Sequence, residues 1–366
     1  MRIRAAVCRE AAGLPKIETL ELEPPRADEI LVRLLAVGVC HTDIRVATQP
    51  MGPRPLVLGH EGAGVVEAVG EGVTEFQPGD RVVMSYAFCG HCLACTRHAQ
   101  AYCLDCVPLN FGGARADGSS PLSKDGETVH GAFFGQSSFA THAVCEARQA
   151  VKAPDDIPLE HLAPLGCGIQ TGAGAVLNSL KLAARQTLAV FGAGSVGLSA
   201  IMAAKAVGAG RIIAVDINPA RLAMAAELGA TDTVDPLQTD PVAAIKALTG
   251  AGADFVLNTT DIAEVYLQGI AALGVKGVFA FVTSPGGDLP VRLSDLMLGG
   301  RSIRGVVQGD SEPREFIPRL IELHRQGRFP LEKLITTYPF EDIAEAMHDS
   351  ETGKTIKPVL VFPQAG

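Results

Sequence analysis

The sequence predicts an α/β protein built from a β-rich domain and a doubly wound parallel sheet. The chain has 366 residues, which exceeds the size at which one hydrophobic core usually stops growing. Its first 80 residues form short apolar runs broken by glycine and proline, whereas apolar runs alternate with helical stretches from Thr187 onward. This alternation ends after about residue 307. We therefore expect one domain from residues 1–167 and 308–366, and a second from residues 168–307.

The β-rich domain is predicted from apolar runs of strand length that end at Pro24-Pro25 or Pro78-Gly79. These expected strands are RIRAAVC (2–8), EILVRLLAVGV (29–39), GAGVVEAVG (62–70) and DRVVMSY (80–86). Residues 89–138 are polar and rich in cysteine and glycine, with little periodicity. So long an irregular stretch is unusual in a compact domain unless a metal fixes part of it.

The second domain is predicted from six continuous apolar strands, which is the pattern of a parallel sheet buried on both faces. The strands are expected at 187–191, 211–216, 231–235, 254–260, 277–283 and 302–307, with helices at 195–208, 219–229, 241–249 and 262–273. Two more helices, 313–327 and 341–349, and a last strand, 357–362, belong to the tail.

Charge and cysteine content limit the possible functions. The net charge is −9 and lysine and arginine form no cluster, which argues against a nucleic-acid partner. Residues 187–210 are apolar but contain five glycines, so we interpret them as strand, turn and helix and expect no membrane segment. Nine cysteines without an apolar signal segment favour a reducing, cytoplasmic setting.

Four cysteines lie within fifteen residues, with the spacing C-x2-C-x2-C-x7-C: Cys89, Cys92, Cys95 and Cys103. Short loops between thiolates let one chain surround a tetrahedral zinc ion, and four sulfurs leave no position for water or substrate. The spacing therefore predicts a structural zinc site in a lobe at about residues 89–106. A disulfide or free-thiol loop is the alternative, and Cys106 competes with Cys103 as fourth ligand.

A dinucleotide-binding motif follows the first strand of the second domain. The run Gly192-Ala193-Gly194-Ser195-Val196-Gly197 is G-x-G-x-x-G and opens a helix, whose N–H groups can bind a pyrophosphate. Asp216 ends the next strand, where a carboxylate accepts hydrogen bonds from ribose hydroxyls and repels a 2′-phosphate. The motif thus predicts NAD over NADP, with Arg221 at the adenine side. A helix N-cap or a solvated strand end is the alternative for Asp216.

Three further motifs carry a family resemblance: Gly38–Asp43 (GVCHTD), Gly59–Gly64 (GHEGAG) and Gly166–Gly168 (GCG). With the cysteine lobe and the glycine motif, they resemble the zinc-dependent medium-chain alcohol dehydrogenases over essentially the whole chain. Residues 134–139 and 164–175 are similar to the bacterial benzyl/aryl-alcohol dehydrogenase branch. The resemblance implies a GroES-like β-rich catalytic domain and a Rossmann NAD-binding domain.

The resemblance also implies a catalytic zinc ion held by Cys40, His60 and Cys167, with a fourth position open to substrate. Asp43 would orient the imidazole of His60 from behind. Glu61 would lie behind the zinc and approach it during ligand exchange. A partly exposed carboxylate on a turn is the alternative for both acids, and a helix N-cap is another for Asp43.

Other roles are carried over from the same family. Thr42 would bind the substrate oxygen and pass its proton outward. His41 and Lys357 would contact cofactor phosphate, although a surface histidine and a solvated lysine are the alternatives, and Thr171 would contact the nicotinamide. Many relatives have a histidine where this chain has Arg45, and arginine cannot act as a base. We therefore expect Arg45 to bind cofactor phosphate and the proton to leave through solvent.

The expected activity is reversible oxidation of aryl, allylic or other apolar primary alcohols to aldehydes. Candidate pocket residues, any of which can equally belong to the core, are Ser85, Tyr86, Phe139, Met51 and Ile169. Alternatives are a glutathione-linked formaldehyde or polyol dehydrogenase and, in another class, a non-catalytic zinc-ribbon binding module. The strand 302–307 is expected at a sheet edge, where two copies can pair into a homodimer or homotetramer.

Overall fold

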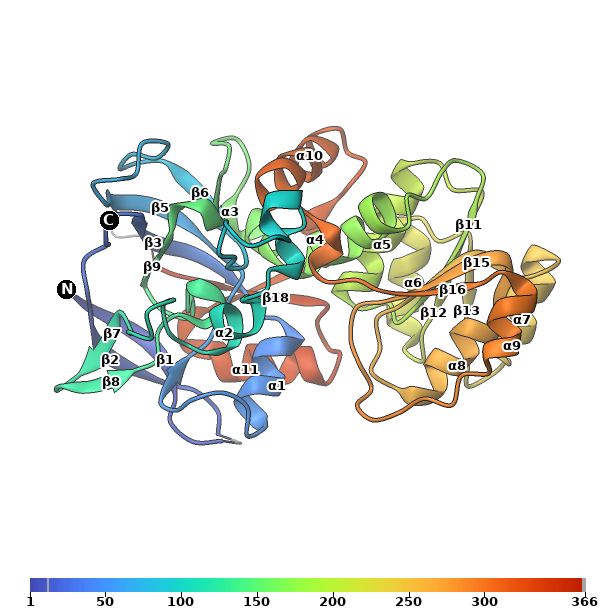
Figure 1. Ribbon diagram of the computed structural model, residues 1–366, viewed down its shortest axis with the longest axis horizontal. Helices are drawn as coiled ribbons and strands as arrows, with labels where there is room; N and C mark the ends of the chain where they lie inside the picture. Colours follow the sequence, from blue (N-terminus) through green and yellow to red (C-terminus); the bar gives the residue numbers. More distant parts are fainter. Residues whose placement is uncertain (12, 364–366) are drawn as a thin grey trace. The chain divides into compact units, whose positions relative to one another are not determined.

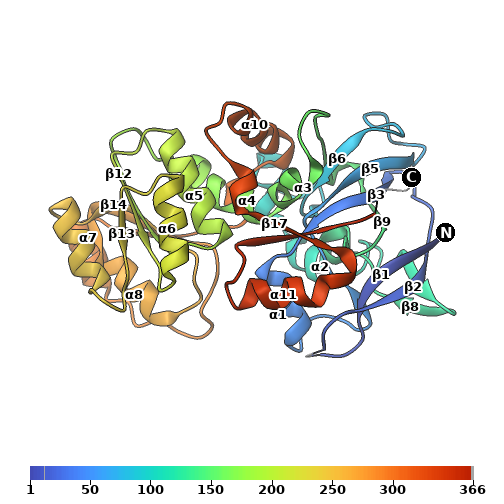
Figure 2. The ribbon, with the colours of Figure 1, turned by 180° about the vertical axis from the view of Figure 1, so that it is seen from behind.

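The computed structural model describes residues 1–11 and 13–363, and the chain divides into two compact units (Figures 1 and 2). Unit 1 contains Met1–Cys167, Glu312–Ile321 and Leu331–Gly366, and unit 2 contains Gly168–Ser311 and Glu322–Pro330. Unit 1 is therefore discontinuous in sequence. Among the described residues, no helix is both long enough and apolar enough to span a bilayer.

Unit 1 is built on two sheets. The five-stranded sheet has the order β4-β1-β2-β7-β8, with bounds Leu56–Val57, Arg2–Cys8, Lys16–Leu22, Leu122–Lys124 and Glu127–Val129. The seven-stranded sheet has the order β10-β6-β5-β3-β18-β17, with bounds Ala150–Lys152, Arg81–Met84, Gly62–Val69, Glu29–Gly38, Lys357–Val361 and Ile335–Pro339, while β9 (His142–Glu146) also pairs with β3.

Close backbone contact between β3 and β5 explains one glycine of the GHEGAG motif. A Cβ on Gly64 would lie 2.1 Å from the carbonyl oxygen of Arg33, so only glycine fits this register.

The helices of unit 1 are α1 (His41–Thr48), α2 (Cys106–Phe111), α3 (Leu159–Leu162) and α11 (Ile343–Glu351). Its 3-10 turns are Cys95–Arg97, Gln100–Tyr102, Phe133–Gly135, Ala147–Gln149, Ala163–Gly166, Leu331–Leu334 and Phe340–Asp342.

Unit 2 is a six-stranded parallel sheet in the order β13-β12-β11-β14-β15-β16, with helices on both faces (Figures 1 and 2). Its strands are Asp232–Val234, Arg211–Val215, Thr187–Phe191, Ala253–Asn258, Leu273–Phe281 and Ser302–Gly305. Its helices are α4 (Gly168–Gly174), α5 (Ser195–Ala206), α6 (Pro219–Leu228), α7 (Pro241–Thr249), α8 (Ala263–Ala271) and α9 (Leu293–Gly299), with a π-helical turn at Ala175–Ser179 and a 3-10 turn at Gln308–Asp310. Helix α10 (Pro313–Arg325) begins in unit 1 and ends in unit 2.

The sheet order confirms the predicted α/β class and the edge position of the strand near residue 302. Strand β11 lies between β12 and β14, so the strand order reverses at β11. Nucleotides bind at such a reversal point in folds of this kind.

The sequence did not predict the short strands β2, β7, β8, β9 and β10 or helix α9. The stretch 89–138, expected to be irregular, contains α2 and the β7–β8 pair.

Candidate metal centres and nucleotide site

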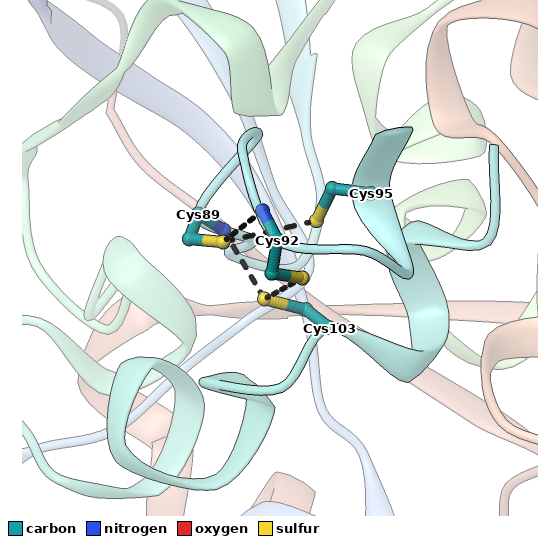
Figure 3. A group of neighbouring side chains, drawn as sticks. All are labelled: Cys89, Cys92, Cys95 and Cys103. Carbon is teal, nitrogen blue, oxygen red and sulfur yellow. Dashed lines mark hydrogen bonds between the residues drawn. The ribbon is translucent and has the colours of Figure 1, made fainter. Parts of the chain in front are cut away.

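The four-cysteine lobe brings its sulfur atoms together as a metal site requires. The ligand atoms of Cys89, Cys92, Cys95 and Cys103 all lie within 4.8 Å of one another (Figure 3). Two measured Sγ–Sγ distances are 4.0 Å (Cys89–Cys95) and 3.9 Å (Cys92–Cys103). Zinc–sulfur bonds of about 2.3 Å place tetrahedral ligands about 3.8 Å apart, whereas a disulfide needs about 2.05 Å. All four cysteines are free, so the cluster fits zinc and excludes the disulfide alternative.

Main-chain N–H groups favour thiolates in this lobe. The amide of Cys92 donates to the sulfur of Cys89 at 3.3 Å, and the amide of Leu104 donates to the sulfur of Cys92 at 3.4 Å. Hydrogen bonds from Cys95 and Leu104 lower the pKa of Cys92 to about 6. Cys106 lies outside the cluster, and its sulfur accepts a hydrogen bond from Asn110 at 3.8 Å. Cys103 is therefore the fourth member of the group.

A second cluster in unit 1 joins residues that are far apart in sequence. The ligand atoms of Cys40, His60, Glu61 and Cys167 lie within 4.8 Å of one another. Cys40 precedes α1, His60 lies between β4 and β5, and Cys167 follows a 3-10 turn. The Nε2 atom of His60 is buried and has no hydrogen-bond partner among the described residues, and a bond to a metal would satisfy it. The residues thus fit a zinc ion.

The thiols of this cluster are electrostatically prepared for a cation. A hydrogen bond with Cys167 holds the pKa of Cys40 well below its ordinary value, while the same contact and burial raise the pKa of Cys167. The lowered pKa of Cys40 favours its thiolate, which is the form that binds a metal.

Asp43 fixes two members of the second cluster. Its Oδ1 accepts hydrogen bonds from Nδ1 of His60 (2.9 Å) and the amide of Gly59 (3.0 Å), and its Oδ2 accepts one from the amide of Cys40 (3.1 Å). The carboxylate is fully buried, so it is not an exposed turn residue. Because Nδ1 of His60 is held by Asp43, Nε2 is the atom left to bind a metal.

Glu61 forms a buried ion pair that the sequence did not predict. Lys357 Nζ lies 3.1 and 3.0 Å from the two carboxylate oxygens of Glu61 and 3.1 Å from the carbonyl oxygen of Val39. Both side chains are buried. Lys357 is therefore not a solvated lysine, and its assignment to cofactor phosphate stays a prediction. A Cβ on Gly38 would lie 2.0 Å from Oε2 of Glu61, which explains that glycine.

Aromatic rings surround His60, and sequence reasoning missed this arrangement. Phe134 stacks on the imidazole with centroids 4.3 Å apart, and Phe133 meets it edge-on at 5.6 Å. Phe111 contacts Phe134 at 5.2 Å. Pairs of adjacent phenylalanines are also common in cores, so no local signal distinguished these two. The rings form an apolar wall at the metal cluster.

The predicted pocket residues lie mostly in cores. Phe139 is fully buried in the main cluster of unit 1, and the Ser85 hydroxyl donates to the carbonyl oxygen of Gly166 at 2.7 Å. Tyr86 and Ile169 are also buried, whereas Met51 is 40% exposed.

Three other expected site residues of unit 1 occupy the first two turns of α1. His41 is exposed there, and Thr42 and Arg45 are half-buried.

The glycine motif of unit 2 has the predicted strand–turn–helix context between β11 and α5. Gly192 has φ +88°, and a Cβ on Gly197 would lie 1.9 Å from the carbonyl oxygen of Gly192. A Cβ on Gly194 would meet no atom within 4 Å, so space remains there for a ligand. Ser195 and Val196 form the first turn of α5.

Asp216 supports the glycine loop directly. Its Oδ2 accepts a hydrogen bond from the amide of Ala193 at 2.7 Å, and its Oδ1 accepts one from the amide of Asn218 at 2.8 Å. Asn218, not Asp216, is the N-cap of α6, which removes that alternative. Arg221 lies 4.0 Å from the carboxylate. Thr171, in α4, is 3.5 Å from the side-chain oxygen of Gln308.

Comparison with known proteins agrees with both units. Residues 26–155 match the alcohol dehydrogenase GroES-like domain, and residues 195–324 match the zinc-binding dehydrogenase domain. A geraniol dehydrogenase of Castellaniella defragrans is 50% identical over 98% of this chain and 97% of its own length.

Two solved structures are similar over nearly the whole chain. An alcohol dehydrogenase zinc-binding domain protein from Burkholderia ambifaria is 50% identical, with TM-score 0.97 and full coverage of both chains. A benzyl alcohol dehydrogenase from Acinetobacter calcoaceticus is 45% identical, with TM-score 0.96, covering 99% of this chain and 100% of its own. The chain therefore belongs to the zinc-dependent medium-chain alcohol dehydrogenases, as its motifs predicted, and this membership removes the zinc-ribbon alternative.

Proposed function

We propose that the protein oxidises apolar primary alcohols, aryl or allylic in type, to aldehydes with NAD as hydride acceptor. The observation that carries this proposal is the second cluster: two sulfurs and an orphaned histidine nitrogen, in a family whose zinc acts in alcohol oxidation. Zinc held by Cys40, His60 and Cys167 would supply a Lewis acid for the alcohol oxygen, and NAD would take the hydride from its carbon.

The protein groups around the cluster would then hold ligands and move a proton. Asp43 keeps the His60 ring in the tautomer that leaves Nε2 for the metal. Thr42, two residues after Cys40 in α1, would accept the alcohol proton and release it to solvent, because Arg45 cannot take it. His41 and Arg45 would contact cofactor phosphate. Lys357 would neutralise Glu61 and limit its approach to the metal.

An apolar substrate is supported by the rings beside His60. Phe111, Phe133 and Phe134 offer an aromatic wall beside the cluster, which suits an apolar substrate better than a polyol or a carboxylated thiol adduct. Relatives at 50% and 45% identity are named for geraniol, an allylic alcohol, and benzyl alcohol. A polyol dehydrogenase usually has glutamate as third ligand, whereas this chain has Cys167.

NAD is supported by Asp216, whose carboxylate stands behind the glycine loop and retains lone pairs for ribose hydroxyls. Gly194 and the first turn of α5 would bind the pyrophosphate, with Arg221 on the adenine side and Thr171 at the nicotinamide. None of the nine cysteines forms a disulfide with another described residue, which suits a reducing, cytoplasmic setting.

A homodimer is proposed through the edge of the unit 2 sheet. All four residues of β16 are exposed, and α9 buries none of its residues: Leu293, Met297 and Leu298 are each at least 74% exposed. An exposed edge strand, together with these exposed apolar side chains of α9, favours pairing with a second copy across a two-fold axis. Sedimentation at micromolar concentration should show dimers or tetramers, and a monomer alone would refute this point.

A substrate panel tests the main proposal. Specificity constants should be highest for benzylic and allylic alcohols with NAD, lower for short aliphatic alcohols, and lowest for polyols. The same panel with NADP should give much lower values, because Asp216 repels the 2′-phosphate. A preference for polyols, or for NADP, would contradict the corresponding assignment.

A further inference from the structure

We propose that Gln136 is a positioning residue for the catalytic zinc site, fixing the main chain at two of its ligands. The inference rests on the proposed function, which places zinc at Cys40, His60 and Cys167. Gln136 makes no contact with the metal ligand atoms themselves. It acts through the peptide groups that carry His60 and, through Ser85, Cys167.

The first contact set brackets the turn that carries His60. The side-chain nitrogen of Gln136 donates to the carbonyl oxygen of His60 at 3.1 Å, and its oxygen accepts from the amide of Gly62 at 3.1 Å. These two contacts fix the peptides on both sides of Glu61. With Asp43 holding Nδ1, the histidine is thus constrained at both ring and backbone.

The second contact set leads to Cys167. The same nitrogen of Gln136 donates to the carbonyl oxygen of Ser85 at 3.0 Å. The hydroxyl of Ser85 donates to the carbonyl oxygen of Gly166, the residue before Cys167, at 2.7 Å. Backbones are in close contact here, since a Cβ on Gly166 would lie 2.2 Å from the carbonyl oxygen of Met84. Gln136 therefore links the two segments that carry His60 and Cys167.

The loop around Gln136 adopts unusual conformations to present this amide. Phe134 and Ser137 have positive φ angles of 51° and 45°, and Gly135 has φ +67°. Non-glycine residues adopt such values only where surrounding contacts demand them. The Ser137 hydroxyl supplies such contacts, donating to the carbonyl oxygen of Val57 at 2.6 Å and accepting from the amide of Phe133 at 2.8 Å. Gln136 itself is 1% exposed, so its amide has no competing water.

Metal release from the full-length zinc-loaded protein tests the proposal. A chromophoric chelator in excess should remove two zinc ions in separate phases, and Cys167→Ser identifies the phase of the catalytic ion. Gln136→Met keeps the side-chain volume but removes all three hydrogen bonds. We expect it to speed release of the catalytic zinc about 10-fold or more, as loss of a metal site's outer partners does, and to leave the four-cysteine zinc unchanged. In cobalt-substituted protein, the same variant should shift the absorption bands of the catalytic ion.

Asn110→Leu is the matched control. Asn110 is also a buried amide, 1% exposed, with three hydrogen bonds to main chain, two to Ala87 and one to Cys106. It should lower the unfolding temperature as Gln136→Met does, without altering the catalytic phase or the cobalt bands. Equal release rates in wild type and Gln136→Met, within twofold, would overturn the proposal.

Ser85→Ala keeps the proposal testable should Gln136→Met fail to fold. It deletes only the link to Gly166, and we expect a smaller acceleration, about threefold, of the catalytic phase. An unchanged rate in Ser85→Ala would refute the path to Cys167. The wild-type zinc content separates the claims. One zinc per chain refutes the proposed function and this inference with it, whereas two zincs with unaltered release in the variants refute only the inference.

Discussion

Replacement of Asp43 by asparagine tests the physical basis of the catalytic metal site. In the native protein the carboxylate accepts three hydrogen bonds, from Nδ1 of His60 and the amides of Gly59 and Cys40, at 2.9 to 3.1 Å and without solvent. Asparagine retains the shape but carries one NH2 group, which faces the amide of Cys40 in one rotamer and both other donors in the opposite rotamer. In the less costly rotamer, one donor–donor contact therefore replaces a charge-assisted hydrogen bond.

The magnitude follows from those contacts. A hydrogen bond to a charged group contributes about 1.5–3 kcal/mol, and a buried donor without an acceptor costs about 1–3 kcal/mol. Because two of the three contacts survive in weakened form, we expect unfolding free energy to fall by roughly 2–4 kcal/mol. Zinc affinity at the catalytic site should fall about 10- to 100-fold, since a neutral amide oxygen holds the His60 ring more weakly than the carboxylate does.

Equilibrium competition with a chelator measures the affinity, and urea unfolding measures the stability. Asp349→Asn is the control: this buried carboxylate accepts from the Tyr338 hydroxyl at 2.8 Å and pairs with Lys354, away from the metal clusters. It should leave the zinc affinity unchanged. If Asp43→Asn lowered stability but left the catalytic zinc as tightly bound as in wild type, the reasoning about His60 would be refuted.

Three further outcomes are expected. Lys357→Met leaves the Glu61 carboxylate buried without a counter-charge and should lower the free energy of unfolding in urea by about 3–5 kcal/mol. The double variant with Glu61→Gln should recover much of this loss. Losses that simply add in the double variant would count against the ion pair. Asp216→Ala should improve the ratio of NADP to NAD specificity constants while Asp232→Ala does not, and a constant ratio would contradict the NAD assignment. Arg9 lowers the pKa of Glu18 to about 2, below its ordinary 4.5, so Glu18 contributes stability that is present above about pH 4.5 and lost as pH falls toward 2. Thermal unfolding of Glu18→Gln should therefore depend less on pH in that window than wild type, and parallel curves would exclude this contribution.

Sequence could predict what depends on local spacing and could not predict what depends on long-range packing. The four cysteines and the glycine motif are short-range patterns. The four sulfur atoms cluster as predicted, and the glycine motif opens a helix as predicted. The contacts of Gln136 with His60 and Ser85 join residues 76 and 51 positions apart, and glutamine carries no periodic signal.

The buried ion pair of Lys357 was not predicted, although the sequence contained part of its signal. Lys357 begins a continuous apolar strand, KPVLV, whose first four residues are all buried. A lysine in such a strand needs a carboxylate partner inside the protein, so solvent or cofactor was the weaker expectation. Its partner, Glu61, could not be found from sequence because it lies 296 residues earlier.

The separation of Glu61 and Lys357 along the chain also constrains how the protein is made. Strand β18 pairs with residues 36–38 of β3, so the strand that covers this edge of β3 and the charge that balances Glu61 are synthesised 296 residues after Glu61. All of unit 2 is synthesised before Lys357. A chain that stops before residue 357 would expose the edge of β3 next to a Glu61 carboxylate without its counter-charge. We expect such a truncated chain to be prone to aggregation and proteolysis.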